Sequence, residues 1–510
     1  MDMWWEGLQT AVQGINLLYL LGGTVFGLII GALPGLGPMF AVTLALPLTF
    51  GLPAATAIIM LSAIHAATAY GDSLASILIN TPGGVGSVAS CWDGFPLSQQ
   101  GKSGYALGIS ASGSFLGGII GWIFLVATAP LLISFALMMG PAEYFMIAIL
   151  ALSLLSMASQ GQTIKGVILG AFGLLLSYIG RDPMWGVPRF TFGSMFLEDG
   201  LPLAVVFIGF FALSQAVVLF EKGGSVMEVR QMKKGVMSGV IDVFRRPITV
   251  IRGGIIGVFL GIMPALGIST ASIIAYLVEK RSSRHPETFG KGAPAGLLAP
   301  EVAKNSCLVG DLIPTLTLGI PGSGVTAIFM AALIMHGIQP GPDYFSKGSL
   351  PYAVFVGILL AQFAFFILGL LFVGQIAKVV MVPMPILVPV IVALSFLGAF
   401  AMRGFMIDIL IAGLFGLLGY ILMKCKWPLP CFVLGFVLGD IVESNFHRAL
   451  LISKGSYLTF LTRPGSLILL ICAILSLTWP YLKPLLFKPR QGSILVEVDN
   501  LGAGRDDMDD

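Results

Sequence analysis

Two polar stretches interrupt an otherwise apolar chain and carry the residue types that could do chemistry. YGDSLASILINTPGG spans residues 70–84 and VGDLIPTLTLGIPGS spans 309–323; both contain Gly-Asp and, ten residues after the Asp, Pro-Gly. An ionisable side chain inside an apolar segment is costly and usually functional. Asp72 and Asp311 are therefore predicted ion-coupling residues that take up Na⁺ or a proton. The alternative is that each Asp caps the helix that follows it.

The Pro-Gly breaks predict places where a ligand meets the backbone. A helix interrupted in a membrane exposes unpaired N–H groups at one broken end, which attract anions, and carbonyl groups at the other, which coordinate cations such as Na⁺. Small and hydroxylated residues let the ligand approach closely, although glycines also serve tight helix packing. The predicted substrate-binding residues here are Asn80, Thr81, Pro82, Gly83, Gly84, Thr315, Thr317, Gly319, Pro321, Gly322 and Ser323. For the two Thr residues of 309–323, the alternative is a hydrogen bond back to their own helix.

Two cationic or ionisable side chains precede the Asp residues at matching places. His65 lies one or two turns before Asp72, and Lys304 takes the corresponding place before Asp311. Either side chain could pair with its Asp or neutralise an anionic substrate, so His65 is a predicted ion-coupling residue and Lys304 a predicted substrate-binding residue. The alternatives are a hydrogen-bonded histidine and an ion pair between Lys304 and Glu301.

The composition identifies the class of protein that surrounds these stretches. The chain has 510 residues, is 56% hydrophobic and 10% charged, and has a mean hydropathy of +0.95, whereas a soluble domain carries roughly 25% charged residues. Apolar stretches near the length needed to cross a bilayer as helix recur near 15–33, 53–69, 104–132, 143–158, 163–180, 200–220, 351–380, 384–400, 405–423 and 466–487. The predicted fold is an all-α polytopic membrane protein with roughly ten to fourteen transmembrane or half-membrane helices.

The charged loops predict one re-entrant helical hairpin. The connector 221–252 holds seven basic and three acidic residues, and 279–291 holds four basic and two acidic ones. The positive-inside rule places both segments in the cytoplasm. Only about 26 residues separate them, including GIMPALG at 261–267, and this is too short for two crossings. A hairpin that enters and returns to the same side, with its tip at 264–267, fits; such backbone is tolerated where protein buries it or water reaches it.

The same two motifs occur in the same order in each half of the chain. GALPGLG at 31–37 precedes GIMPALG by 230 residues, and the two Gly-Asp…Pro-Gly elements are 239 residues apart. An internal duplication explains both offsets, with about nine additional residues in the second copy. Interrupted hydrophobic segments at corresponding places in two halves indicate a transporter's substrate site. The predicted organisation is 1–225 first transmembrane repeat, 226–250 basic cytoplasmic connector, 251–488 second repeat and 489–510 polar C-terminal tail. Whether the repeats are inverted or parallel stays open.

Several other functions find no support in the sequence. No G-x-x-x-x-G-K-[ST] motif is present, which argues against direct ATP coupling. The four His residues are scattered and no acidic cluster lies in the apolar segments, so we expect no enzyme, no metal site and no cofactor beyond a coupling ion. The five Cys residues lack C-x-x-C spacing and indicate neither metal nor disulfide. No nucleic-acid partner is expected. An ion or anion channel that uses the broken helices as a filter remains the alternative to a transporter.

Seven motifs together resemble one family. They are GALPGLGP, YGDSLASILINTPG, DGFPLSQQGKSG, RDPMWGVPRFTFG, APEVAKN, LTLGIPGS and HGIQPGP, in this order. This pattern resembles the large membrane subunit of the bacterial tripartite tricarboxylate transporters, the TctA family, from about residue 15 to 465. The segments 80–84 and 319–323 look like the family's Pro-Gly segments.

The resemblance implies a function that the residues alone do not establish. It implies a multi-pass secondary transporter of the bacterial inner membrane that works with a small, TctB-like membrane subunit and a periplasmic, TctC-like solute-binding protein. Such systems carry citrate or other carboxylates and use a cation gradient. The sequence leaves open which carboxylate is carried, whether Na⁺ or H⁺ drives it, and the oligomeric state, a homo-oligomer included.

Overall fold

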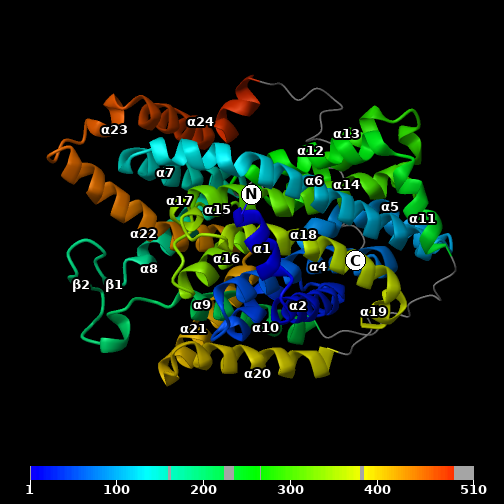
Figure 1. Ribbon diagram of the computed structural model, residues 1–510, viewed down its shortest axis with the longest axis horizontal. Helices are drawn as coiled ribbons and strands as arrows, with labels where there is room; N and C mark the ends of the chain where they lie inside the picture. Colours follow the sequence, from blue (N-terminus) through cyan, green and yellow to red (C-terminus); the bar gives the residue numbers. More distant parts are fainter. Residues whose placement is uncertain (1, 159–161, 223–234, 265, 380–383, 487–510) are drawn as a thin grey trace.

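Helices make up nearly all of the regular structure. The computed structural model describes residues 2–158, 162–222, 235–264, 266–379 and 384–486 (Figure 1). The first half contains α1 (Asp2–Ala11), α2 (Gly14–Ala32), α3 (Pro38–Ala45), η1 (Leu46–Thr49), α4 (Ala54–Ile79), η2 (Val85–Ser87), α5 (Val88–Gln99), α6 (Ser103–Met138), α7 (Pro141–Ala158), α8 (Thr163–Ser177), the antiparallel pair β1 (Gly180–Arg181) and β2 (Pro188–Arg189), η3 (Met195–Leu197), α9 (Leu203–Phe207), the π-helix η4 (Ile208–Leu213) and α10 (Ser214–Lys222).

The second half repeats much of this order. It contains α11 (Val236–Phe244), α12 (Pro247–Ile262), α13 (Gly267–Ser282), η5 (Pro286–Thr288), α14 (Pro294–Gly310), α15 (Leu312–Leu318), α16 (Gly324–Met335), α17 (Pro342–Phe345), α18 (Leu350–Leu371), α19 (Val373–Val379), α20 (Met384–Arg403), α21 (Met406–Lys424), α22 (Leu429–Ile452), α23 (Thr459–Thr462) and α24 (Pro464–Leu486). Two helices, α4 and α14, lie at the centre, since residues 56–78 and 296–310 are all buried.

The all-α polytopic prediction is confirmed. Within the described ranges, eight helices are long and apolar enough to cross a membrane. Helices suit this setting because a bilayer offers no partner for backbone N–H and C=O groups, which must bond within the segment. One candidate span was missed: α22, with 24 residues, is long and apolar enough to cross a membrane, and its Asp440 and Glu443 interrupt the apolar run in the sequence.

The polar stretch at residues 70–84 is not the start of a helix. Helix α4 continues through Asp72 to Ile79, so the interpretation of Asp72 as a cap is wrong. Gly71 is tolerated inside the helix because a Cβ there would lie 3.0 Å from the Gly31 Cα of the neighbouring α2, which shows that the two backbones touch. Asp311 stands at the junction of α14 and α15, where its side chain makes no capping hydrogen bond.

A helical hairpin is present where the charged loops predict it. Helices α12 and α13 have 16 residues each, or about 24 Å at 1.5 Å per residue, which is short of a roughly 30 Å hydrocarbon core. They pack against each other and against α14. The chain turns between Ile262 and Gly267, and residue 265 of the predicted tip lies outside the described ranges.

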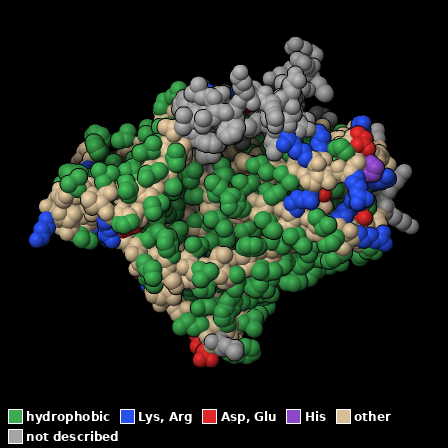
Figure 2. Space-filling model, turned by 90° about the horizontal axis from the view of Figure 1, so that it is seen from above, with side chains coloured by type: hydrophobic (Ala, Val, Ile, Leu, Met, Phe, Trp, Pro, Cys, Tyr) green, Lys and Arg blue, Asp and Glu red, His purple; other side chains and the backbone are tan. Residues whose placement is uncertain are grey.

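Basic side chains gather at one end of the molecule. Helices α11 and α13 lie toward this end, opposite the end that holds β1, β2 and α23 (Figure 1). Figure 2 shows Lys and Arg clustered at one side of a face that is otherwise largely hydrophobic. Arg281 is exposed in the last turn of α13, and Arg284 and Lys291 are exposed in the loop that follows. The positive-inside rule predicts that the end with α11 and α13 faces the cytoplasm, and this stays a prediction.

Corresponding helices of the two halves make corresponding contacts. In α2, a Cβ at Gly27 would lie 2.6 Å from a carbonyl oxygen of α4, and a Cβ at Gly31 would lie 2.5 Å from another. In α12, a Cβ at the equivalent Gly257 would lie 2.3 Å from a carbonyl oxygen of α14, and a Cβ at Gly261 would lie 2.4 Å from another. Small residues four apart let two helix backbones approach closely. The two halves therefore pack their corresponding helices in the same way, through glycines four residues apart.

The contacts also show how the halves are oriented. Helices α6 and α18 hold equivalent places, and they run antiparallel, because Phe115 stacks on Phe366 whereas Trp122, two turns later, donates its indole N–H to the carbonyl of Phe355. Helix α1 packs on α18, and its counterpart α11 packs on α6. Equivalent helices that meet antiparallel across a two-fold axis belong to an inverted repeat. The domain bounds given above remain a prediction.

The two Pro-Gly segments share one local geometry. Asn80 ends α4 and Gly319 ends α15, both in the left-handed region with φ of 55° and 70°. The chain then folds back onto its own helix. A Cβ at Gly83 would lie 2.5 Å from the Asp72 Cα, and a Cβ at Gly322 would lie 2.7 Å from the Asp311 carbonyl oxygen. Glycine is needed at both places because the loop lies directly against helix backbone.

We therefore predict that Gly83→Ala and Gly322→Ala destabilise the protein by about 1–3 kcal/mol each, since the added methyl group forces backbone apart. Gly22→Ala is the matched control, because a Cβ at Gly22 would meet nothing within 4 Å. Thermal unfolding of the detergent-solubilised variants measures the effect. Equal midpoints for the three variants would show that these turns relax freely.

Candidate functional site

One cavity of about 640 Å³ lies where the interrupted segments of both halves converge. Its wall includes both Pro-Gly segments and both hairpin turns, so segments more than 200 residues apart line a single space. The lining residues are Gly35, Gly37, Pro38, Met39, Phe40, His65, Gly84, Val85, Gln162, Phe211, Ser214, Gln215, Leu266, Gly267, Ile268, Ser269, Asp311, Ser323, Gly324, Val325, Met423, Lys426, Trp427, Pro428, Leu429, Pro430, Cys431 and Leu434.

Only some of the predicted site residues line this cavity. His65, Asp311, Gly84 and Ser323 do so. The other members of the Pro-Gly segments form the turns themselves, where Asn80 and Thr81 are exposed and where Pro82, Gly83, Gly319, Pro321 and Gly322 range from half-buried to buried. Interrupted helices therefore build the wall, and a few of their residues face the space inside.

Thr315 and Thr317 form hydrogen bonds back to their own helix, as the alternative to substrate binding predicted. The Thr315 hydroxyl donates to the Asp311 carbonyl oxygen and the Thr317 hydroxyl donates to the Ile313 carbonyl oxygen, both at 2.6 Å. Thr315 also accepts a hydrogen bond from the Gly322 N–H at 3.2 Å. Thr315 thus joins the helix to the loop that folds back on it, and neither Thr lines the cavity.

Asp72 is paired with the lysine of the other half. The Lys304 ammonium lies 2.8 Å from Asp72 Oδ1, and both side chains are fully buried. It also contacts Glu301 Oε2 at 3.3 Å, as the alternative interpretation held, and donates to the Ser73 hydroxyl. The sequence analysis offered Asp311 of the same half, Glu301 or an anionic substrate as partners of Lys304. The structure also pairs it with Asp72 across the repeat interface, because α4 and α14 cross at this point.

Glu301 lies in a cradle of hydroxyl groups that the sequence analysis did not find. Ser73 donates to Oε1 at 2.6 Å, and Ser110 and Ser114 of α6 donate to Oε2 at 3.0 and 2.9 Å. Ser90 of α5 also donates to Oε1. Each serine alone looks like a small filler of an apolar helix. Only their convergence from three helices identifies the cradle, in which a buried carboxylate has the partners it requires.

Asp311 and His65 contrast with this paired cluster. Asp311 is 2% exposed and its Oδ1 has no hydrogen-bond partner, while Ser323 bonds to the same carboxylate. His65 is 1% exposed, its Nδ1 is without a partner, and its ring lies 5.5 Å from that of Phe329. Both residues line the cavity. Two buried polar groups are thus left available to whatever fills it.

Lys426 is a cavity-lining cation that the sequence analysis missed. It lies in the short loop between α21 and α22 and adopts a left-handed φ of 56°. The signal was present in LMKCKWPLP at 422–430, where a basic residue and Pro interrupt an apolar stretch, but nothing in the sequence placed this loop beside the Pro-Gly segments. Gln215 also faces the cavity and donates to the Gly35 carbonyl oxygen at 3.0 Å.

Comparison with known proteins supports the sequence resemblance. The chain matches the family described as "Tripartite tricarboxylate transporter TctA family" over residues 17–434, which is most of its length. The chain belongs to the TctA family. It is 35% identical over 462 residues to an Agrobacterium vitis protein described as an uncharacterized 52.8 kDa protein of the TAR-I ttuC′ 3′ region, covering 90% of this chain and 91% of that one.

A second relative supports the same assignment. It is an Agrobacterium vitis protein of the TAR-II ttuC′ 3′ region, 35% identical over 226 residues, which is 43% of this chain and 93% of the relative. No solved structure matches the chain.

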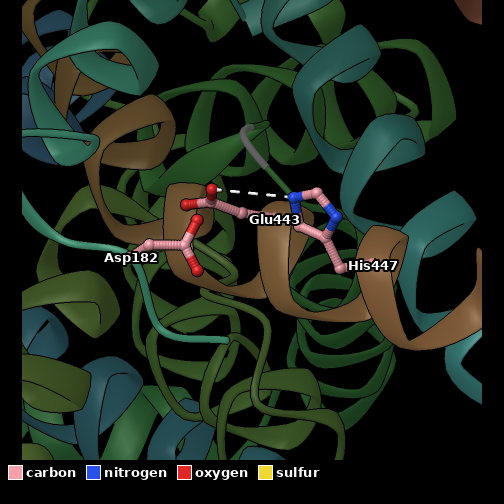
Figure 3. A group of neighbouring side chains, drawn as sticks. All are labelled: Asp182, Glu443 and His447. Carbon is pink, nitrogen blue, oxygen red and sulfur yellow. Dashed lines mark ion pairs between the residues drawn. The ribbon is translucent and has the colours of Figure 1, made fainter. Parts of the chain in front are cut away.

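A second ionisable cluster of this TctA-family chain lies outside the cavity lining, beside the β1–β2 ribbon. The ligand atoms of Asp182, Glu443 and His447 fall within 4.8 Å of one another (Figure 3), a spacing that could hold a metal ion. Arg189 already occupies this place, since it bonds to both oxygens of Glu443 and lies 3.3 Å from Asp182 Oδ2. With a guanidinium inside it, the cluster fits an ion pair between the loop and α22 better than a metal site.

The pKa of Asp182 is lowered from its ordinary value. The backbone N–H groups of Trp185 and Met184 donate to its Oδ1 at 2.8 and 2.7 Å, and Arg189 adds a nearby positive charge. A carboxyl whose folded pKa is lowered stabilises the folded state above its unfolded pKa and loses that effect as the pH falls through the folded value. The stabilisation that Asp182 contributes to the loop is therefore present at neutral pH and is lost as the pH falls below about 4.

We predict that Lys304→Met destabilises the protein strongly, by about 3–5 kcal/mol, because it leaves the Asp72 and Glu301 carboxylates buried without a counter-charge. Adding Asp72→Asn and Glu301→Gln removes all three charges and is expected to recover most of this loss. Lys347→Met, at an exposed lysine, is the control. The free energy of unfolding in detergent is the measurement. A Lys304→Met protein as stable as the control variant would contradict the assigned role of the pair.

We also predict that Arg189→Gln loosens the loop 180–200 at neutral pH, since Asp182 and Glu443 then repel each other. Hydrogen exchange in that loop should rise, and in the unaltered protein a similar rise should appear only when the pH falls below about 4. Arg181→Gln is the matched control, because Arg181 pairs with Glu198 in a largely exposed ion pair. Unchanged exchange in Arg189→Gln would show that other contacts hold the loop.

Proposed function

We propose that this chain is the membrane subunit through which a small carboxylate crosses the bacterial inner membrane, driven by a Na⁺ or H⁺ gradient. The carboxylate is citrate, another tricarboxylate, or a related di- or monocarboxylate. A periplasmic solute-binding protein delivers it, and a small membrane subunit completes the assembly. The observation that carries this proposal is the single cavity lined by the interrupted segments of both halves.

The cavity has the groups that an anion needs. Helix α16 begins at Gly324, which lines the cavity with Ser323 and Val325, and the first N–H groups of a helix have no partner within it. They point a partial positive charge at the space, where an anion is favoured. Lys426 adds a full positive charge. The proposed ligand binds with one carboxylate at Lys426 and another at the start of α16, since both line the same cavity.

The inverted repeat provides a route for alternating access. In transporters built from inverted repeats, the substrate lies at the repeat interface and one part of each half moves against the rest. Here the hairpin turns and Pro-Gly segments of both halves meet at one cavity. The β1–β2 ribbon lies at the end opposite the basic loops, and under the positive-inside rule a periplasmic binding protein approaches from that end.

Of the three residues predicted to couple an ion, Asp72, Asp311 and His65, the two that line the cavity, Asp311 and His65, are proposed for that role, whereas Asp72 is paired with Lys304. Each is buried near the middle of a helix or at a break, where an ionisable group is costly unless it serves a purpose. Lys304 contacts the cavity only indirectly. It pairs with Asp72, and Asp72 Oδ2 lies next to the cavity-lining Gly84, where an added Cβ would be 2.9 Å from this oxygen.

Uptake into proteoliposomes tests the function. The chain is reconstituted with its small subunit and binding protein, and radiolabelled mono-, di- and tricarboxylates are offered under an imposed Na⁺ or H⁺ gradient. We expect accumulation of one carboxylate class that depends on one gradient with a fixed ion-to-substrate ratio. Conductance without a fixed ratio would favour the channel alternative, and no gradient-driven uptake of any carboxylate would overturn the proposal.

Lys426 gives a sharper test of the binding site. We predict that Lys426→Gln raises the KM for the transported carboxylate by roughly ten- to hundredfold, the effect of losing one charge-assisted hydrogen bond. Lys426→Arg should retain part of the affinity. Lys454→Gln is a matched control, since Lys454 also has a left-handed φ, 55°, but is exposed and does not line the cavity. An unchanged KM in Lys426→Gln would remove this lysine from the site.

A further inference from the structure

The four ionisable positions of the central helices form two pairs related by the repeat. The offset of 239 residues relates His65 to Lys304 and Asp72 to Asp311. Lys304 crosses the interface to bind Asp72. In an inverted repeat the equivalent crossing brings His65 of α4 toward Asp311 of the second half. The two sides of the interface therefore carry the same layout with different residues.

The first pair is closed. Lys304, Asp72 and Glu301 are all fully buried, and none of them lines the cavity. The ammonium contacts both carboxylates, and the hydroxyl cradle satisfies Glu301. Asp72 Oδ2 has no hydrogen-bond partner, but Asp72 does not line the cavity; the cavity-lining residue next to this oxygen is Gly84, where an added Cβ would lie 2.9 Å from it. Because Lys304 already neutralises the Asp72 carboxylate, we expect Asp72 not to bind and release a cation during each transport cycle.

The second pair is open. Asp311 and His65 both line the cavity, and Asp311 Oδ1 and His65 Nδ1 have no partner. The other ionisable groups among the described residues of the cavity wall are Lys426, on the α21–α22 loop, and the Cys431 thiol of α22. Cys307 lies one turn before Asp311 on α14, and the neighbouring α12 presents only the backbone of Gly257 and Gly261 at their contacts with α14. No described ion pair joins Asp311 to a basic residue.

A buried carboxylate in this position requires a cation from outside the fold. A carboxylate in an apolar interior is stable only when it is paired, protonated or bound to a metal ion. Lysine supplies a permanent positive charge at Asp72, whereas the residue at the equivalent position of the first half is His65, which lines the same cavity as Asp311 and carries no permanent charge. Because one half has His65 where the other has Lys304, one of the two equivalent sites is able to bind and release a cation.

We propose that Asp311, assisted by His65, is the exchangeable site for the small monovalent cation, H⁺ or Na⁺, that drives transport, and that Asp72 is a fixed structural charge. This inference rests on the proposed function. It assigns the two equivalent Asp residues different roles: Asp311 gains and loses its cation at the cavity in each cycle, while Asp72 stays paired with Lys304 across the repeat interface.

The test compares Asp311→Asn with Asp72→Asn in proteoliposomes. Substrate counterflow without a gradient measures whether the cavity still binds and carries the carboxylate, and uptake under a gradient measures coupling. We expect Asp311→Asn to keep counterflow and to lose the stimulation by the gradient. In Asp72→Asn, which is expected to be less stable, the ratio of gradient-driven uptake to counterflow should stay as in the unaltered protein. Loss of that ratio in Asp72→Asn, or its retention in Asp311→Asn, overturns the proposal.

Two further measurements identify the cation and cover the case in which Asp311→Asn fails to fold. Binding of radioactive Na⁺ to the purified protein, displaced by unlabelled Na⁺ and lost in Asp311→Asn, assigns Na⁺. Absence of Na⁺ binding, together with uptake driven by a pH gradient in Na⁺-free medium, assigns H⁺. His65→Gln should then raise the Na⁺ concentration for half-maximal uptake or shift the pH profile of uptake. A His65→Gln protein unchanged in both measurements contradicts the proposed assistance.

These outcomes separate the inference from the function on which it rests. If the unaltered protein shows no counterflow of any carboxylate, the proposed function fails. If it transports, and Asp311→Asn transports with the same gradient dependence, only the assignment of the cation site fails.

Discussion

A helix that breaks inside a membrane leaves backbone N–H and C=O groups without water to bond, and the rest of this structure follows from how they are satisfied. Each Pro-Gly segment folds back on the helix it ends, so that the Gly83 N–H donates to the Asp72 carbonyl oxygen and the Gly322 N–H donates to Thr315 Oγ1, both at 3.2 Å. Glycine is required because the loop touches helix backbone. The breaks thereby become rigid walls of a cavity.

The charges of the interior are distributed unequally over a nearly symmetric scaffold. Lys304 and Glu301 come from the second half and are held by side chains of the first, which ties the two repeats together at their most buried point. Replacing a buried ion pair of this kind by apolar groups often costs little, so its value lies in specifying which helices meet. The equivalent place beside Asp311 holds no lysine and opens to the cavity. Symmetry in the backbone thus coexists with asymmetry in charge.

The inverted arrangement also explains why the cavity lies where it does. Antiparallel contact of α6 with α18 sets the axis of the repeat, and elements near such an axis meet their own counterparts. Hairpin turns and Pro-Gly segments from both halves therefore face one space. The loop that carries Lys426 enters this space from outside the matched motifs, and it brings a positive charge that neither motif contains.

The sequence by itself determined the all-α membrane fold, the duplication and the two interrupted segments, because hydropathy, loop charge and motif spacing are properties of neighbouring residues. It placed the hairpin of α12 and α13 for the same reason. Its errors have a common cause. Gly-Asp suggested a helix start at Asp72, yet packing of α2 on α4 carries the helix past it, and the polar residues of α22 hid a buried span. The partner of Lys304, the serine cradle of Glu301 and the place of Lys426 were decided only by tertiary structure, since each depends on distances between segments far apart in the chain.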